Sequence, residues 1–98
     1  FLVENYIQHS PEATDGLDGI GDFLDWIKAT HPAHRNIIKR IFAQDDYVIV
    51  HLHCPVGPGE ADLAVVDLFR LDDAGMIAEH WDVVQHVPPT SKNNNTMF

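Results

Sequence analysis

The sequence predicts a small α+β domain in which one helix covers one face of an antiparallel sheet. Three observations predict this class. Apolar residues recur at helical spacing in the first half, β-rich runs fill the second half, and short turn sequences separate those runs. A helix followed by consecutive strands is typical of an α+β layer arrangement. A chain of 98 residues has room for one domain, which we assign to residues 1–98.

The helix is expected over residues 14–29. Apolar side chains follow one another there at steps of three and four residues, namely Leu17, Ile20, Phe23, Leu24 and Ile27. Thr14 or Asp15 can serve as the N-cap, and Pro32 lies just beyond the end. The following segment, residues 34–42, fits either a helical face or a strand with one side in water, and periodicity alone does not decide between them.

Three β-rich runs are expected at residues 47–54, 61–71 and 76–85. The Pro/Gly loop 55–59 and the four-residue loop 72–75 separate them, and such short connections predict an antiparallel meander. The polar segment from residue 88 to residue 98 cannot build a core, so we expect an extended C-terminal arm.

Three polar residues fall on an otherwise apolar face of the last two runs. If residues 72–75 form a four-residue loop, Leu71 pairs with Met76 and Asp67 lies opposite His80. Alternation places Asp82 on the same face. Two carboxylates beside an imidazole in an apolar setting can exchange protons near neutral pH. The alternative is that Asp67 and His80 only satisfy each other across the ladder, or that this face is in water.

His51 and His53 have the spacing of a metal-binding pair on a strand. The opposite phase of that strand is purely apolar and should face the core, which turns both histidines outward, so no metal site is expected there. Cys54 lies on the apolar phase and is expected to be a small core residue rather than a nucleophile. Trp81 lies on the face opposite His80, where it suggests a dimer interface.

Composition excludes several classes of partner. Six Lys and Arg against fifteen Asp and Glu give a formal charge of −9, which repels phosphate backbones and anionic membrane surfaces. We therefore expect neither nucleic acid nor a membrane as partner. A single cysteine and the lack of a basic region leading into an apolar stretch favour a cytoplasmic protein.

Four segments carry a resemblance to a known family: residues 6–11 (YIQHSP), 65–70 (VVDLFR), 77–85 (IAEHWDVVQ) and 93–98 (NNNTMF). Together they resemble the SnoaL-like polyketide cyclase family of the NTF2-like superfamily, and most closely its group of predicted aldol-condensation enzymes. The resemblance implies a cone in which a strongly curved, mostly antiparallel sheet wraps a helix and encloses an apolar pocket, usually in a homodimer. It also implies that residues 34–42 form a strand, and that the usual N-terminal helix is missing ahead of Tyr6.

The same resemblance implies cofactor-free chemistry through pocket carboxylates and histidines. Asp82 is similar to the working aspartate of the last strand, Asp67 to a second pocket residue, and His9 is expected to lean over the pocket mouth. The candidate catalytic set is therefore Asp82, His80, Asp67 and His9, with no cofactor and no metal.

Three functions are compatible with this set. The first is an enzyme that transfers a proton next to a carbonyl of a small hydrophobic substrate, with Asp82 as the base and His80, held by Asp67, stabilising the enolate. The second is a non-catalytic ligand-binding module with the same pocket. The third is epoxide or ester hydrolysis by a water that Asp82 activates.

Overall fold

The computed structural model describes all 98 residues and contains one helix and five strands. In chain order these are β1 (Leu2–Gln8), α1 (Gly16–Thr30), β2 (Ile37–Gln44), β3 (Tyr47–Cys54), β4 (Leu63–Leu71) and β5 (Ile77–His86). The predicted α+β class is confirmed. No helix in the protein has the length and apolar character needed to cross a membrane.

Helix α1 begins at the residue expected from its cap. Of the two candidates, Asp15 is the N-cap, and its Oδ1 accepts the backbone N–H of Gly16 at 2.9 Å. The same oxygen accepts the backbone N–H of Gln8 at 2.8 Å. One carboxylate therefore caps the helix and ties its start to the end of β1.

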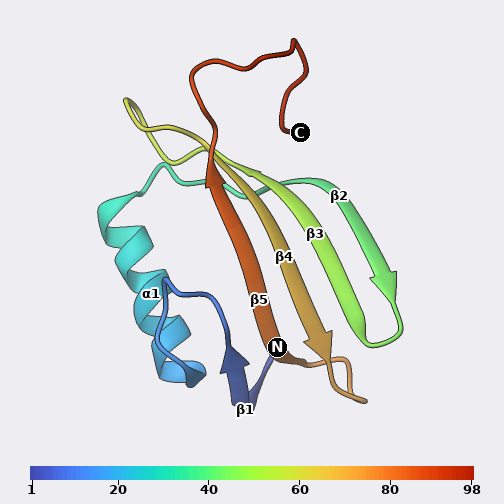
Figure 1. Ribbon diagram of the computed structural model, residues 1–98. Helices are drawn as coiled ribbons and strands as arrows, with labels where there is room; N and C mark the ends of the chain where they lie inside the picture. Colours follow the sequence, from blue (N-terminus) through green and yellow to red (C-terminus); the bar gives the residue numbers. More distant parts are fainter.

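The sheet has the order β1-β5-β4-β3-β2 (Figure 1). Strands β3 to β5 form the predicted antiparallel meander, and β2 extends it by pairing antiparallel with β3. Strand β1 pairs with β5 in parallel. Strand β1 is not among the elements predicted from the sequence. Glu4 and Asn5 interrupt its apolar pattern, and the register is irregular between Leu2 and Ile7, so β1 is a strand because of a partner some 70 residues away along the chain.

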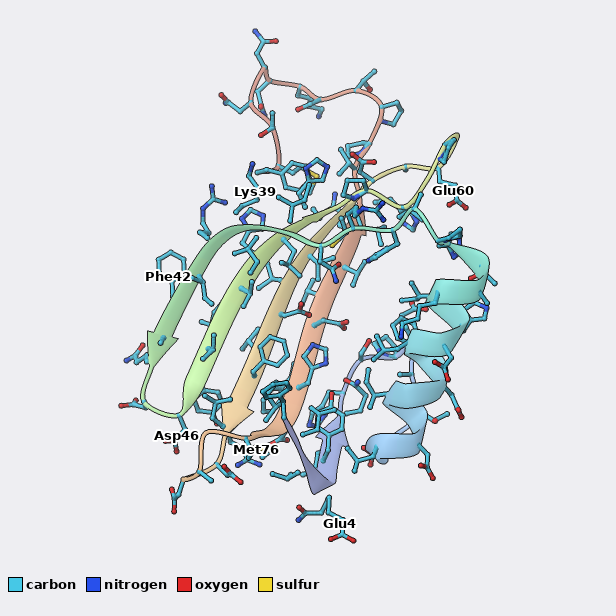
Figure 2. The ribbon with its side chains drawn as sticks, turned by 180° about the vertical axis from the view of Figure 1, so that it is seen from behind. Glu4, Lys39, Phe42, Asp46, Glu60 and Met76 are labelled. Atoms are coloured by element: carbon cyan, nitrogen blue, oxygen red, sulfur yellow. The ribbon has the colours of Figure 1, made fainter.

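The resemblance implied a strand at residues 34–42, and strand β2 is present but covers residues 37–44, so residues 34–36 precede it. Every residue of β2 is exposed, because β2 is the free edge of the sheet, far from the helix, as the positions of Lys39 and Phe42 show in Figure 2. Antiparallel pairing of Ile37 to Gln44 with β3 decides for the strand, where periodicity left the choice open.

The expected register of β4 and β5 is wrong by two residues. Asp67 pairs with Asp82 rather than with His80. At the end of the strand, past an irregularity, the shift is one residue, and Leu71 pairs with Ile77 rather than with Met76. The Asp72 side chain accepts the backbone N–H groups of Ala74 and Met76, both at 2.9 Å, and the register shifts again between Arg70 and Leu71. Because the side-chain period of a strand is two, a shift of two residues keeps each side chain on its predicted face.

The core lies on the inner face of the sheet. Val50, Leu52, Cys54 and Val65 form a buried cluster, with Val48, Leu63 and Phe69 packed against it. Helix α1 lies beside β1, away from β2 (Figure 1), and of its residues Gly19 alone is buried. Because α1 does not close onto the sheet, an open space remains between the helix and the inner face.

The C-terminal arm has no regular secondary structure after residue 86 and returns toward the sheet. The Phe98 ring stacks on His53 with ring centroids 4.0 Å apart, and Arg40 Nη2 donates to the backbone oxygen of Phe98 at 3.2 Å. The arm therefore lies against the outer face of β2 and β3.

Candidate active site

A cavity of about 680 Å³ lies between α1 and the inner face of the sheet. Its size is typical of pockets for small organic molecules. Of its 24 lining residues 15 are hydrophobic, so a ligand there would contact mainly carbon. The helix contributes Ile20, Phe23, Leu24, Trp26 and Ile27, and the sheet contributes the inner phases of β3, β4 and β5.

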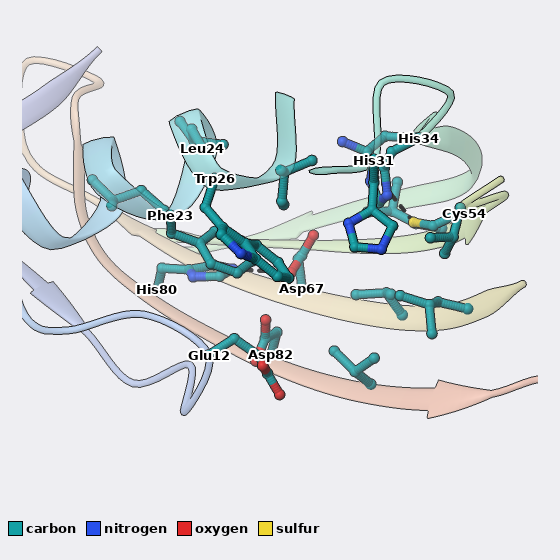
Figure 3. Close-up of a pocket in the computed structure, with 18 of the residues that line it drawn as sticks. Glu12, Phe23, Leu24, Trp26, His31, His34, Cys54, Asp67, His80 and Asp82 are labelled. Carbon is teal, nitrogen blue, oxygen red and sulfur yellow. Dashed lines mark hydrogen bonds and ion pairs between the residues drawn. The ribbon is translucent and has the colours of Figure 1, made fainter. Parts of the chain in front are cut away.

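Asp67, His80 and Asp82 face this cavity together, as expected (Figure 3). His80 Nε2 lies 2.9 Å from Asp67 Oδ1, and the two side chains are 12% and 15% exposed. In the observed register His80 is diagonal to Asp67, a separation that long side chains bridge. The predicted contact is thus present although the register that suggested it was wrong.

Asp82 differs from the other two because it forms no hydrogen bond within the chain. Its carboxylate lies directly across the ladder from that of Asp67, a placement that like charges make unfavourable. The ligand atoms of Asp67, His80 and Asp82 lie within 4.8 Å of one another. The arrangement provides one unpaired carboxylate beside a carboxylate–imidazole pair.

The second ring nitrogen of His80 is also engaged. Nδ1 lies 2.8 Å from Oε1 of Gln8, a buried residue on β1. Both nitrogens therefore have partners, and His80 presents no free N–H to the cavity. Sequence reasoning missed Gln8 because its role depends on the parallel pairing of β1 with β5.

Tyr6 is a further pocket residue, which the sequence showed only as part of a motif. It is 4% exposed and lines the cavity. Burial, followed by the charges of Asp82 and Asp67, raises the pKa of Tyr6 to about 12, and the Gln8 amide opposes this shift. Tyr6 is therefore a neutral phenol and a proton donor beside both carboxylates.

His9 does not lean over the pocket mouth, and that expectation is wrong. Its Nε2 lies 2.7 Å from Glu79 Oε2, and its ring stacks on Trp81 with centroids 4.8 Å apart. Hydrogen bonds from His9 and Arg70 lower the pKa of Glu79, so this carboxylate is a stable anion. The reason is alternation: Gln8 points to His80, and its neighbour His9 therefore points to the outer face.

The far end of the cavity carries a second group of polar residues. Figure 3 shows His31, His34 and Cys54 there, on the side of Trp26 away from His80. His31 Nε2 lies 3.4 Å from Glu60 Oε1, and His34 Nε2 lies 2.9 Å from Asn36 Oδ1. Cys54 is 2% exposed, and burial followed by the charge of Asp67 raises its pKa to about 11, which agrees with a core residue rather than a nucleophile.

The histidines of β3 point outward, as expected from the apolar phase opposite them. His51 contacts Arg40, and His53 Nε2 lies 2.7 Å from Asp62 Oδ2. Ligand atoms suited to a metal converge instead at Asp67, His80 and Asp82. A metal ion there would have to displace the proton between His80 and Asp67.

The model of the SnoaL-like domain family matches residues 1–80. No curated protein matches the sequence. Among solved structures, a candidate polyketide cyclase from Bacillus cereus ATCC 10987 superimposes with a TM-score of 0.73 at 20% identity, over 85% of this chain and 58% of that one. A candidate isomerase of the SnoaL-like family from Agrobacterium tumefaciens gives 0.72 at 15% identity, over 86% and 74%.

AclR, a candidate hydroxylase from Streptomyces galilaeus, superimposes with a TM-score of 0.71 at 18% identity, over 87% of this chain. The chain spans 63% of the length of AclR. At these identities the likenesses show the shared fold, a curved sheet around a helix. Because the family model covers residues 1–80 of 98, the chain belongs to the SnoaL-like domain family.

Proposed function

We propose that this protein is a cofactor-independent enzyme of cyclase or isomerase type, which transfers a proton next to a carbonyl group of a small hydrophobic substrate. The observation that supports this most is the unpaired Asp82 carboxylate, which stands in an apolar cavity beside the Asp67–His80 pair. The descriptions of the Bacillus and Agrobacterium proteins as candidate cyclase and isomerase point in the same direction.

Asp82 acts as the general base in this proposal. The C–H bond next to the carbonyl breaks, its electron pair forms the enolate, and Asp82 holds the proton. In an isomerisation the proton returns to another carbon. In an intramolecular aldol cyclisation the enolate carbon attacks a second carbonyl, and the proton passes to the resulting alkoxide oxygen.

His80 and Tyr6 stabilise the enolate oxygen. Because both nitrogens of His80 are engaged, by Asp67 and Gln8, His80 acts through the positive charge of its protonated ring rather than through a free N–H. The Tyr6 hydroxyl remains protonated and supplies the hydrogen bond. These groups are held in place before the reaction, so they need not reorganise as the charge develops.

The cavity sets the class of substrate. Its lining includes the apolar side chains of Phe23, Trp26, Leu52 and Val65, and the volume admits a molecule of one or two rings. The polar groups around His31 at the far end accommodate a hydroxyl or carbonyl group distant from the reacting carbon.

Two alternatives use the same residues. In a ligand-binding module, Asp67 and His80 satisfy each other and only orient the ligand. In an epoxide or ester hydrolase, Asp82 activates a water, which its unpaired carboxylate also permits.

Hydrogen–deuterium exchange at the carbon next to the carbonyl of 1-tetralone, followed by NMR in D₂O, tests the proposal with a simple two-ring ketone as the probe. The wild-type protein should accelerate exchange, and Asp82→Asn should reduce the maximal rate by roughly 100- to 10,000-fold with little change in the half-saturating concentration. His80→Gln should reduce the maximal rate by a smaller factor than Asp82→Asn does. Asp73→Asn, an exposed carboxylate in the β4–β5 turn, is the matched control and should retain full activity.

Fluorescence of Trp26, which lines the cavity, reports binding of 1-tetralone separately from exchange. Binding without accelerated exchange would favour the ligand-binding module. Exchange that is equally fast in Asp82→Asn would remove Asp82 from the mechanism. The absence of both binding and exchange would contradict ketones as the substrate class.

A further inference from the structure

We propose that Gln8 is a positioning residue that holds one proton of His80 on Nδ1, so that Nε2 and Asp67 share a single proton at the edge of the cavity. This deepens the proposed function and rests on it only for its effect on turnover. Gln8 itself does not line the cavity, whereas His80 and Asp67 do.

The fold places Gln8 against the back of His80. The two are register partners in the parallel pairing of β1 with β5, and the backbone N–H of His9 donates to the His80 carbonyl at 2.9 Å. Gln8 is 9% exposed, and its Oε1 lies 2.8 Å from His80 Nδ1. This contact lies on the side of the ring away from Asp67, which faces Nε2.

A backbone group decides which end of the Gln8 amide faces His80. The N–H of Ser10 points at the same amide atom at 3.1 Å, in a buried position. A backbone N–H can only donate, so the atom it meets must be the amide oxygen. This orientation leaves Gln8 Nε2 buried without a partner, whereas the reverse orientation would set an NH₂ group against the N–H of Ser10.

The tautomer of His80 follows from this orientation. Because Oε1 only accepts, Nδ1 carries a proton in the imidazolium form of the ring and, as long as Asp67 holds the other proton, in the neutral form as well. Nε2 then either donates to the Asp67 carboxylate or accepts from the Asp67 carboxylic acid. The tautomer protonated only on Nε2 would face a Nδ1 lone pair with the Gln8 oxygen, which is repulsive.

The chemical consequence is a positive charge on the ring of His80, the residue that stabilises the enolate oxygen in the proposed reaction. Gln8 Oε1 and the Asp67 carboxylate are both acceptors, so the imidazolium form of His80 is the form that satisfies both. The other titratable groups near the ring are Tyr6 on β1, Asp82 on β5 and Glu12 in the β1–α1 loop, all on the cavity. Without the Gln8 oxygen, neutral His80 would keep its proton on Nε2 toward Asp67.

Nitrogen-15 NMR of the His80 ring tests the tautomer directly, without any substrate. In the wild-type protein at neutral pH Nδ1 should show an N–H-type shift, while Nε2 shows the shift of a nitrogen that shares its proton with Asp67. Gln8→Leu should move the neutral ring to the Nε2–H tautomer. Gln8→Glu retains an acceptor for both Nδ1–H and Ser10 N–H, so it should keep the wild-type tautomer, and Gln85→Leu on the exposed part of β5 is the matched control.

A wild-type ring with a bare Nδ1 at neutral pH would overturn the proposal, and so would a Gln8→Leu spectrum identical to that of the wild type. If circular dichroism shows that Gln8→Leu does not fold, the wild-type and Gln8→Glu spectra still decide which ring nitrogen carries the proton.

In the 1-tetralone assay, Gln8→Leu should lower the maximal rate at unchanged affinity. Gln8→Glu should restore it, because the Glu carboxylate also accepts a hydrogen bond from Nδ1–H. Failure of the exchange assay alone would contradict the proposed function but leave the tautomer result intact.

Discussion

Two buried side chains of the cavity keep their protons at pH values where exposed groups of the same type lose them. Burial is the main cause for both, and it raises the pKa of Tyr6 to about 12 and that of Cys54 to about 11. The Asp67 charge adds to both shifts. The cavity therefore contains a neutral phenol and a neutral thiol next to carboxylates, which suits proton donation but not attack by a thiolate.

These shifts predict that the protein loses stability in alkaline solution. The ordinary pKa values are 10.0 for Tyr6 and 9.0 for Cys54, so from about pH 9 to about 12 the folded chain holds protons that the unfolded chain has released. Stability therefore falls as pH rises through this window. Urea unfolding between pH 7 and 11 measures the slope, which should flatten in Cys54→Ala from about pH 9 and in Tyr6→Phe from about pH 10. The exposed Tyr47→Phe is the control, and an equal effect of both tyrosine variants would contradict the argument.

At the scale of elements, the junction between β1 and α1 holds the helix over the cavity. Asp15 links the end of β1 to the start of α1, and Gly19, in the first turns, packs against Thr14. A Cβ at Gly19 would lie 2.0 Å from the Thr14 carbonyl oxygen, whereas a Cβ at Gly21 would meet nothing within 4 Å. The two glycines of one helix thus provide a matched pair.

Gly21→Ala should stabilise the protein by about 0.4–1 kcal/mol, because alanine restricts the unfolded chain and favours helix. Gly19→Ala should destabilise it by about 1–3 kcal/mol, since the clash is with backbone that cannot swing aside. Chemical unfolding of the two variants measures both values. A stabilised Gly19→Ala protein would show that the β1–α1 junction is not packed as described.

The elements also show which features a local sequence pattern can predict and which it cannot. The ranges of α1 and β3 follow from periodicity and cap residues, because their signals lie within the segment itself. Strand β1 does not, since its pairing partner is β5. The register of β4 and β5 depends on two hydrogen bonds of the Asp72 side chain, which a count of loop residues does not reveal.

At the scale of the whole molecule, much apolar surface remains in water. The radius of gyration is 14.7 Å, against about 13 Å for a compact domain of roughly 100 residues. On the outer face of the sheet Val83 is 69% exposed, Phe42 61% and Val66 36%, while Trp81 is partly covered by His9. An exposed apolar sheet face of this kind is typical of an interface.

We therefore expect a homodimer through the outer face of the sheet. Val83→Glu should shift the protein toward monomer, because it places a charge in the middle of that face. Ala74→Glu, in the exposed β4–β5 turn, adds the same charge elsewhere and should leave assembly unchanged. Sedimentation at high micromolar concentration distinguishes the two variants, and a monomeric wild-type protein would contradict the prediction.

The sequence by itself determined the α+β class, the helix, the meander and the face shared by Asp67, His80 and Asp82, because these depend on periods of 3.6 and two residues that survive an error of register. The tertiary structure decided the rest of the site. It turned His9 outward and brought Gln8 and Tyr6 to the carboxylates, since the parallel pairing of β1 with β5 joins the two ends of the chain. No local pattern in residues 2–8 encodes that pairing, and the proposed tautomer of His80 depends on it.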